Sequence, residues 1–124
     1  MRRISTGSPF EETMAYSRAV VRGNWCFVSG ATGYDYGTMT MPQAPLEQAH
    51  NCFKTIFMVL EQAEFSRTDI VRVQYTVRDA ACVEQIAPAL REALGDVRPA
   101  ATMVIAGLIR PEMKVEVEVT AMKE

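Results

Sequence analysis

The apolar residues in the middle of the chain change their spacing from that of a helix to that of a strand. Between positions 45 and 63 they recur at steps of three and four, which places them on one face of a helix with Pro45 in its first turn. These residues are Leu46, Ala49, Phe53, Ile56, Leu60 and Ala63. From 70 to 78, in IVRVQYTVR, apolar and polar residues alternate as in a strand with one buried face. The sequence therefore predicts a helix packed on a sheet, followed by one strand of that sheet.

A second helix is predicted after this strand. Asp79 can cap a helix that runs to about Leu94 and ends at Gly95. Pro88 lies inside this segment, and an interior proline costs about 3 kcal/mol. We therefore expect the regular helix either to begin only near Ile86, with the proline in its first turn, or to kink.

The last quarter of the chain predicts two strands joined by a turn. Residues 102–109 are apolar on both faces, as in a central strand that is covered on both sides. Residues 110–112 form the turn, and from 113 to 120 apolar and polar residues alternate strictly. The residues expected to face the core are Met113, Val115, Val117 and Val119.

Near the N-terminus, two strand-like segments flank a tight turn. SRAVVR at 17–22 and WCFVS at 25–29 lie on either side of Gly23-Asn24, a pair that can adopt the positive φ values of hairpin turns. The following segment, 30–45, is rich in Gly, Pro and small polar residues, which predicts a loop. Within it, YGTMTM can form a short edge strand.

Together these elements predict an α+β fold in a single domain, residues 1–124. Right-handed crossovers in this order of strands and helices give a mixed β-sheet with two helices packed on one face. The opposite face would be bare. Because the apolar run at Met103, Ile105 and Ile109 needs cover, we expect the bare face to pack against other subunits.

The composition narrows the classes of function. The formal net charge is −2 and the 13 Lys and Arg residues are scattered, which argues against nucleic-acid binding. No segment approaches the ~18 consecutive apolar residues of a membrane helix. Arg2 and Arg3 are not followed by the apolar segment of a secretory signal. We therefore expect a cytoplasmic protein without a membrane partner.

Cysteine and histidine usage argues against a metal site. Cys26, Cys52 and Cys82 are widely spaced in apolar surroundings, without a C-x-x-C motif. His50 is the single histidine and lies one step off the apolar stripe of the first long helix. We expect buried, reduced thiols and a partly exposed histidine.

The chain carries none of the strong catalytic signatures, including G-x-S-x-G, the Walker loop and the dinucleotide-binding fingerprint. The candidates for chemistry are Glu116 and Glu118, on the polar side of the last predicted strand. Either both belong to a solvated strand face, or a carboxylate there faces a cleft between subunits and orients a water molecule.

Three segments resemble the RidA/YjgF family, whose fold is also called chorismate-mutase-like. They are SGATG after the hairpin, DIVRVQYTVRD, and RPAATMVIAGLIRPEMKVEVEVTA, and the similarity extends from AYSRAV to VEVEVTA. The resemblance implies a homotrimer with a central barrel and three clefts between subunits that bind a small molecule. It also implies hydrolysis of enamine and imine intermediates to a 2-oxo acid and ammonia, without a metal or an organic cofactor.

The resemblance also assigns candidate site residues. Glu116 matches the glutamate that helps to position water, which makes it the candidate catalytic residue. Tyr16, Ser29 and Gly30 match positions that bind the ligand.

Two further ligand-binding positions differ from the family pattern. Ala101 stands where active members carry the arginine that grips the substrate carboxylate, and Met103 stands at the family's cysteine. An asparagine that some active members carry corresponds to Ala87. Since each charge-assisted hydrogen bond is worth ~1.5 to 3 kcal/mol, the missing arginine predicts at least ten- to hundredfold weaker binding of a 2-imino acid.

Another arginine could supply the missing charge. Arg98 lies three residues before Ala101, and an odd offset on a strand points its side chain to the other face unless a bulge intervenes. Arg18, Arg72 and a neighbouring subunit remain alternatives.

Two hypotheses of function follow. The first is a family member that binds or hydrolyses a small metabolite unlike the usual 2-imino acid; if it is an enzyme, it is a hydrolase or deaminase of small imine- or carbonyl-type metabolites. The second is a non-catalytic trimer that binds a small ligand in its cleft, or a partner through the YDYGTM loop. An endoribonuclease label is attached to the family as well, but the acidic charge balance argues against RNA as a partner.

Overall fold

Six strands form one mixed β-sheet in the order β1-β2-β3-β6-β4-β5. The computed structural model describes all residues from 1 to 124. The strands are β1 (Arg2–Ile4), β2 (Ala19–Arg22), β3 (Trp25–Thr32), β4 (Ile70–Val77), β5 (Ala100–Ile105) and β6 (Val115–Met122). Neighbouring strands are antiparallel except β4 and β5, which are parallel and joined by a helix.

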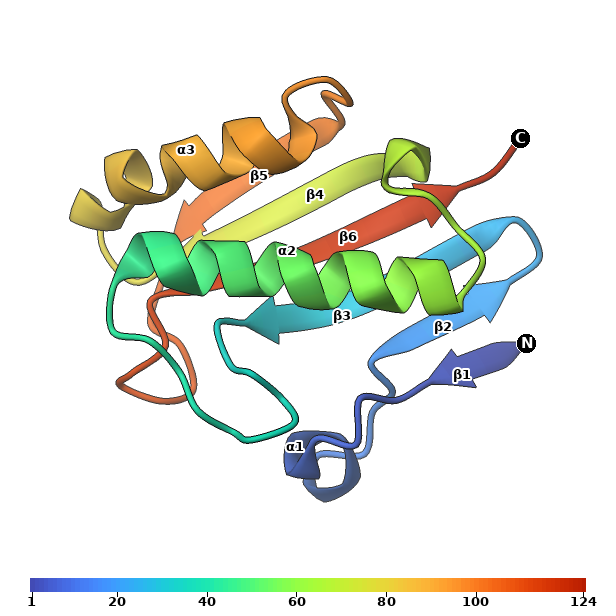
Figure 1. Ribbon diagram of the computed structural model, residues 1–124, viewed down its shortest axis with the longest axis horizontal. Coiled ribbons are helices and arrows are strands. Elements are labelled where there is room, and N and C mark those ends of the chain that lie inside the picture. The colour runs from blue at the N-terminus through green and yellow to red at the C-terminus, as the bar shows by residue number, and fades with distance from the viewer.

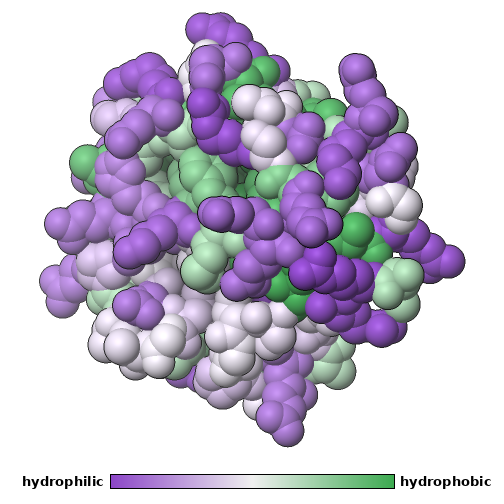
Figure 2. All heavy atoms as spheres, turned by 45° about the vertical axis from the view of Figure 1, so that its right-hand side comes forward, coloured by the Kyte–Doolittle hydropathy of each residue, from purple (hydrophilic) through white to green (hydrophobic).

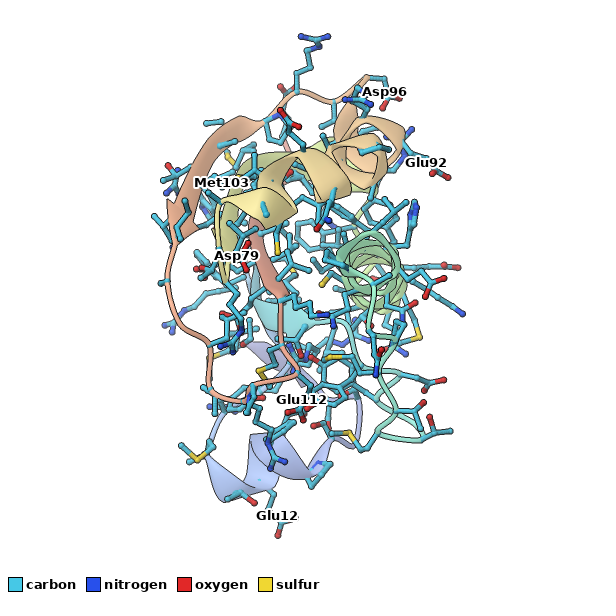
Figure 3. All side chains as sticks on the ribbon, turned by 90° about the vertical axis from the view of Figure 1, so that its left-hand side faces the viewer. Glu12, Asp79, Glu92, Asp96, Met103 and Glu112 are labelled. Atoms are coloured by element: carbon cyan, nitrogen blue, oxygen red, sulfur yellow. The ribbon has the colours of Figure 1, made fainter.

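Two long helices cover one face of the sheet, as Figures 1 and 3 show from the front and from the side. Helix α2 (Pro45–Gln62) packs on β3 and β6, and α3 (Ala81–Leu94) packs beside it. The short helix α1 (Pro9–Thr13) lies below the sheet in Figure 1, and a 3-10 turn (Arg67–Asp69) leads into β4. The predicted α+β fold, with a mixed sheet and both long helices on one face, is confirmed.

The hydrophobic core lies between the helices and the sheet. Core side chains that are at most 3% exposed include Ile56, Val59 and Leu60 of α2, Ile86 of α3, Val73 and Val77 of β4, and Val115, Val117 and Val119 of β6. The alternation predicted for the last strand is therefore confirmed. In β4 the alternation fails at Val71, which is 43% exposed. The pairing of β4 with β6 shifts register between Ile70 and Arg72, and such a shift moves a side chain to the other face.

The predicted hairpin is confirmed. Strands β2 and β3 pair in antiparallel fashion around the turn, where Gly23 has a φ of 56°. Strand β3 continues to Thr32, beyond the predicted end at 29, because its last residues pair with Val117 and Glu116 of β6.

The short edge strand expected in YGTMTM does not form. The Asp35 carboxylate accepts hydrogen bonds from the backbone N–H groups of Gly37 and Thr38, 2.9 and 3.3 Å away. This side-chain turn replaces strand pairing, and one isolated bridge to Thr40 is left.

Helix α3 begins at Ala81 and continues through Pro88, so the predicted start near Ile86 is wrong. The N-cap position belongs to Ala80, one residue after the predicted Asp79, but the Asp79 carboxylate accepts a hydrogen bond from the Ala81 N–H at 3.0 Å and so satisfies one N–H of the first turn. Cys82 lies before the proline and is 4% exposed, so the first turn contributes to the core. This burial offsets part of the cost of an interior proline.

Strand β5 lies at the edge of the sheet, which corrects the prediction of a central strand. The central position belongs to β6, because β6 pairs with both β3 and β4. The strand also ends at Ile105 instead of 109, and Ile105 and Ile109 are 57% and 82% exposed. A strand that is apolar on both faces must be covered on both faces, but its sequence does not determine whether the same chain or another chain covers it.

The sheet face away from the helices carries exposed apolar side chains. Trp25 and Phe27 of β3 stack with their ring centres 6.1 Å apart, and Met122 is paired with Trp25. All three are more than a third exposed. By contrast, the surface in Figure 2 is mostly hydrophilic, and hydrophobic atoms are visible mainly in gaps between polar side chains.

Three smaller observations complete the fold. Cys26, Cys52 and Cys82 are buried free thiols, as expected. The His50 side chain is 44% exposed, also as expected, with Nδ1 3.8 Å from the Glu92 carboxylate. None of the helices combines the length and the apolar character that crossing a bilayer requires.

Candidate functional site

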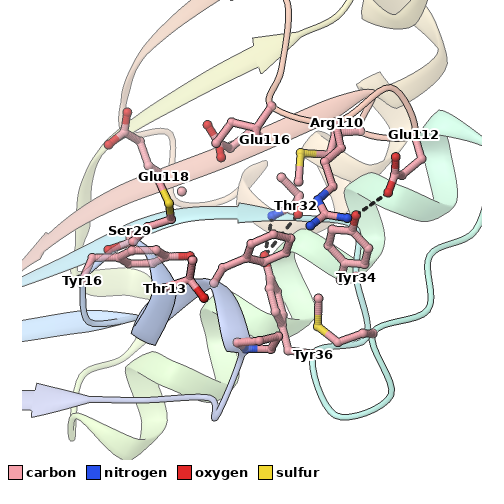
Figure 4. Close-up of a pocket in the computed structure, with 17 residues that line it drawn as sticks. Thr13, Tyr16, Ser29, Thr32, Tyr34, Tyr36, Arg110, Glu112, Glu116 and Glu118 are labelled. Carbon is pink, nitrogen blue, oxygen red and sulfur yellow. Dashed lines mark hydrogen bonds between the residues drawn. The ribbon is translucent and has the colours of Figure 1, made fainter.

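A cavity of about 910 Å³ lies where β3 and β6 meet α1 and two loops (Figure 4). Its walls come from residues 9–16, from the end of β3 with the loop 33–39, and from residues 109–118. Glu116 and Glu118 reach it from the side of β6 opposite the buried Val117, because alternate residues of a strand point to opposite faces. The volume lies within the ~300 to 1,000 Å³ that is usual for small-molecule sites.

Glu116 is a partly buried carboxylate of the cavity. It sits opposite Thr32 of β3, and Figure 4 shows it beside Glu118 at the top of the cavity. Burial raises its pKa above the ordinary value, the negative charge of Glu118 raises the pKa further, and Arg18 opposes both effects. A carboxyl group with a raised pKa is suited to accept a proton from a water molecule and to return it.

Gly30 makes room for the Glu116 carboxyl group. A Cβ atom at position 30 would lie 2.6 Å from Cδ and 2.7 Å from Oε2 of Glu116. The pairing of β3 with β6 shifts register between Val28 and Ala31, so a bulge brings the glycine backbone under the carboxylate.

Arg18 supports this bulge from inside the protein. Its side chain is fully buried, and its guanidinium donates hydrogen bonds to the backbone carbonyls of Gly30 at 2.6 Å and Ser29 at 3.4 Å. Its Nε has no hydrogen-bond partner and lies 3.9 Å from the Glu11 carboxylate. The guanidinium carbon lies 4.8 Å from the ring centre of Tyr36, within cation–π range.

Two tyrosines of the loop after β3 form one wall of the cavity. The Tyr34 hydroxyl donates to the Glu112 carboxylate at 2.7 Å, and burial together with this contact raises the pKa of Tyr34 to about 12. The Tyr36 hydroxyl accepts a hydrogen bond from the Thr32 N–H at 2.9 Å. The two ring centres are 6.0 Å apart.

A second cavity, of about 390 Å³, lies on the other side of these two tyrosines, against α2.

Arg110 brings positive charge to the rim. Its guanidinium carbon lies 4.9 Å from the ring centre of Phe10, on α1. Arg110 lies two residues before Glu112, and Figure 4 shows both side chains on the same side of the cavity.

Comparison with known proteins identifies the family. The family model for endoribonuclease L-PSP matches residues 6–123. A RutC family protein encoded in the leuC 5' region of Leuconostoc mesenteroides subsp. cremoris is 33% identical over 125 residues, which cover 97% of this chain and 96% of that protein. Rv2704 of Mycobacterium tuberculosis, a member of the YjgF/YER057c/UK114 family, has a crystal structure that is 30% identical, covers 98% of both chains and superposes with a TM-score of 0.89. The chain belongs to the RidA/YjgF family.

The fold is shared with more distant members of the RidA/YjgF family. The crystal structure of the Escherichia coli YjgF gene product superposes with a TM-score of 0.89 over 100% of both chains, at 21% identity. The resemblance in the segments SGATG, DIVRVQYTVRD and RPAATMVIAGLIRPEMKVEVEVTA is thereby confirmed.

Four of the six residues assigned from the RidA/YjgF motifs lie together. Tyr16, Ser29, Gly30 and Glu116 all line the cavity. Ser29 and Tyr16 are fixed by their neighbours, since the Ser29 hydroxyl donates to the Ser17 carbonyl at 2.7 Å and the Tyr16 hydroxyl accepts from Arg18 at 3.4 Å.

Ala101 and Met103 do not line this cavity. Both belong to the edge strand β5, and Figure 3 shows Met103 far above Glu112. A cleft to which β5 of another subunit contributes remains a prediction. Arg98 precedes β5, is exposed, and donates to the Gly95 carbonyl at 3.1 Å, so it does not reach the cavity.

Sequence reasoning missed several residues of the site. Tyr34 and Tyr36 belong to the YDYGTM loop, which was a candidate for binding a partner but was not assigned to the same site as Glu116. No sequence pattern indicated that Arg18 is buried. The side chains around it are those of Glu11, Tyr16 and Tyr36, which come from α1 and from two other segments.

Proposed function

We propose that this RidA/YjgF protein hydrolyses a small imine in the cavity, with Glu116 as the group that positions and activates water. The placement of Glu116 carries the proposal. Its carboxyl group lies in a cavity of suitable size, has a raised pKa and faces a glycine that leaves space beside it. The products are a carbonyl compound and ammonia, and no metal or organic cofactor takes part.

The chemical step balances with water as the only co-substrate. The Glu116 carboxylate takes a proton from water while the water oxygen bonds to the imine carbon, and the C=N electron pair moves to nitrogen. The imine nitrogen is protonated before the attack, so the product is a neutral carbinolamine. Glu116 returns its proton to this nitrogen, the carbon–nitrogen bond breaks with its electron pair going to ammonia, and the hydroxyl proton passes to the leaving ammonia as the oxygen forms the carbonyl. Each turnover restores the carboxylate.

The preferred substrate differs from a 2-imino acid. Ala101 has no group that could bind a carboxylate, and the buried Arg18 already donates to backbone carbonyls. Hydrolysis of freshly generated 2-iminobutanoate should therefore be slow, and Ala101→Arg should raise it if position 101 contributes to the site.

The proposed assembly is a homotrimer in which β5 and the open sheet face contact neighbouring chains. Its support is the exposed apolar surface, including the stacked Trp25 and Phe27, and Ile105 on β5. Light scattering should give about three times the chain mass of 13.8 kDa. A species of the chain mass would contradict the trimer.

The decisive experiment compares two carboxylates of the same chain. Glu116→Gln should lower the rate of ammonia release from imines by about 100-fold or more, since general acid–base catalysis contributes ~10² to 10⁴. Glu84→Gln, on the exposed side of α3, is the matched control and should leave the rate unchanged. If Glu116→Ala leaves both ligand affinity and turnover unchanged, that result favours a binding protein over an enzyme.

A further inference from the structure

Within one chain, the residues that line the cavity carry more negative than positive charge. Three carboxylates line it, those of Glu112, Glu116 and Glu118, against one guanidinium, that of Arg110. The Arg110 guanidinium also rests against the Phe10 ring. The balance of accessible charge therefore attracts cations and repels anions.

Arg18 does not reverse this balance. Its side chain is fully buried and does not line the cavity. Two of its hydrogen bonds go to the carbonyls of Ser29 and Gly30, and its Nε faces the Glu11 carboxylate at 3.9 Å. Its guanidinium is thus closed to direct contact with a ligand, although its charge still acts on Glu116, and a carboxylate inside the protein opposes that charge.

Four of the thirteen other lining residues are aromatic. Phe10, Tyr16, Tyr34 and Tyr36 come from both sides of the cavity. The face of an aromatic ring attracts a cation electrostatically, and the ring surface also packs against apolar groups. The guanidinium of Arg18 already lies over the rings of Tyr16 and Tyr36. That of Arg110 lies over Phe10, so Tyr34 is the ring without a cation from the protein. A ligand that joins a positive charge to an apolar body would contact both kinds of lining.

We propose that this cavity selects a cationic ligand without a carboxylate: an ammonium or iminium group on an apolar body about the size of one aromatic ring. For a substrate, the inference rests on the proposed function, because an iminium ion is the form of an imine that water attacks most readily. Carboxylates beside the nitrogen favour that protonated form. A 2-imino acid would add a negative group next to Glu116 and Glu118.

Binding of three matched probes tests the charge selection without any turnover. The probes share one phenyl ring: 2-phenylethylammonium is a cation, phenylalanine adds a carboxylate to it, and 3-phenylpropanoate is an anion. We expect calorimetry or NMR titration to show the cation binding at least tenfold more tightly than either of the others. Added salt should weaken its binding, since screening reduces the attraction between charges.

Variants of the charged residues test where the selection originates. Glu118→Gln should weaken binding of 2-phenylethylammonium several-fold, and Arg110→Gln should strengthen it. Glu84→Gln removes an equal charge outside the cavity and should leave binding unchanged. Circular dichroism of each variant separates loss of charge from loss of fold.

A turnover assay separates this inference from the proposed function. A flavin-dependent amine oxidase generates the cationic imine from 2-phenylethylamine, and an amino acid oxidase generates the 2-imino acid from phenylalanine. Equal acceleration of both hydrolyses would uphold the proposed function and overturn the charge selection. No acceleration of either, with the cation still bound most tightly, would uphold the charge selection and overturn hydrolysis. Equal binding of the three probes, tightest binding of the anion, or no saturable binding of the cation also overturns the selection.

Discussion

Replacing Gly30 by alanine should lower activity while leaving the fold intact. The new Cβ atom would lie 2.6 Å from Cδ of Glu116, whereas carbon atoms in contact need about 3.5 Å. The carboxyl group must therefore retreat by about 1 Å. A misplacement of that size at a reacting group costs on the order of 100-fold in rate.

The effect on stability should be small, because the atoms that must move belong to the end of a side chain. We expect Gly30→Ala to lower kcat/KM for imine hydrolysis ten- to hundredfold, and to change the free energy of unfolding by less than about 1 kcal/mol. Ammonia release measures the first quantity, and urea denaturation measures the second.

Two other glycines provide matched controls. A Cβ atom at Gly33 would lie 2.6 Å from Cβ and 2.7 Å from the backbone Cα of Gln48, so Gly33→Ala should destabilise the fold by ~1 to 3 kcal/mol. A Cβ atom at Gly107 would meet nothing within 4 Å, and Gly107→Ala should be silent in both assays. Full activity of Gly30→Ala, or a loss of stability equal to that of Gly33→Ala, would refute the assigned role of the Glu116 carboxyl group.

Three further predictions concern the charges around the cavity. Arg18→Leu should lower the free energy of unfolding by about 3 kcal/mol in urea titrations, because it leaves the buried Glu11 without its cation, and a loss below 1 kcal/mol would contradict this. Glu118→Gln should move the acidic limb of the kcat/KM profile to lower pH, since the Glu118 charge raises the pKa of Glu116, and an unmoved limb would count against that coupling. Folding raises the pKa of Glu116 above its ordinary value of 4.5. The stability that this carboxyl group contributes is therefore present below pH 4.5 and is lost as the pH rises through the folded-state pKa. Glu116→Gln stays neutral, so thermal melts should show it more stable than the parent near pH 7 but not at pH 4, and equal melting temperatures at both pH values would exclude the effect.

Periodic segments made much of the fold predictable. The helix at 45–63, the strand at 70–78 and the alternation after 113 each appear within a residue or two of the expected bounds, because each has one buried face. Strand β5 was misplaced because an apolar run on both faces fits either a central strand or an edge strand covered by another molecule. Pro88 was misleading because local propensity is outweighed where a helix packs against a core.

The site was less predictable than the fold. The four residues Tyr16, Ser29, Gly30 and Glu116, named from family motifs, line one cavity because all four lie at fixed places on β3, on β6 or before β2, and their role as a site stays a prediction. Tyr34 and Tyr36 lie in a loop, where no regular period links the position of a residue in the sequence to the direction of its side chain. The burial of Arg18 depends on packing between segments distant in the chain, which a single sequence does not encode locally.

The two edges of the sheet differ in how well they resist aggregation. Strand β1 is three residues long and carries Arg2 and Arg3, and short length and charge are both features that prevent strands of separate molecules from pairing. Strand β5 has six residues, AATMVI, none of them charged, and its outer backbone groups are free in the single chain. Variants that weaken the proposed trimer should therefore precipitate through β5 instead of persisting as separate chains, and a lysine placed in this strand should keep them in solution.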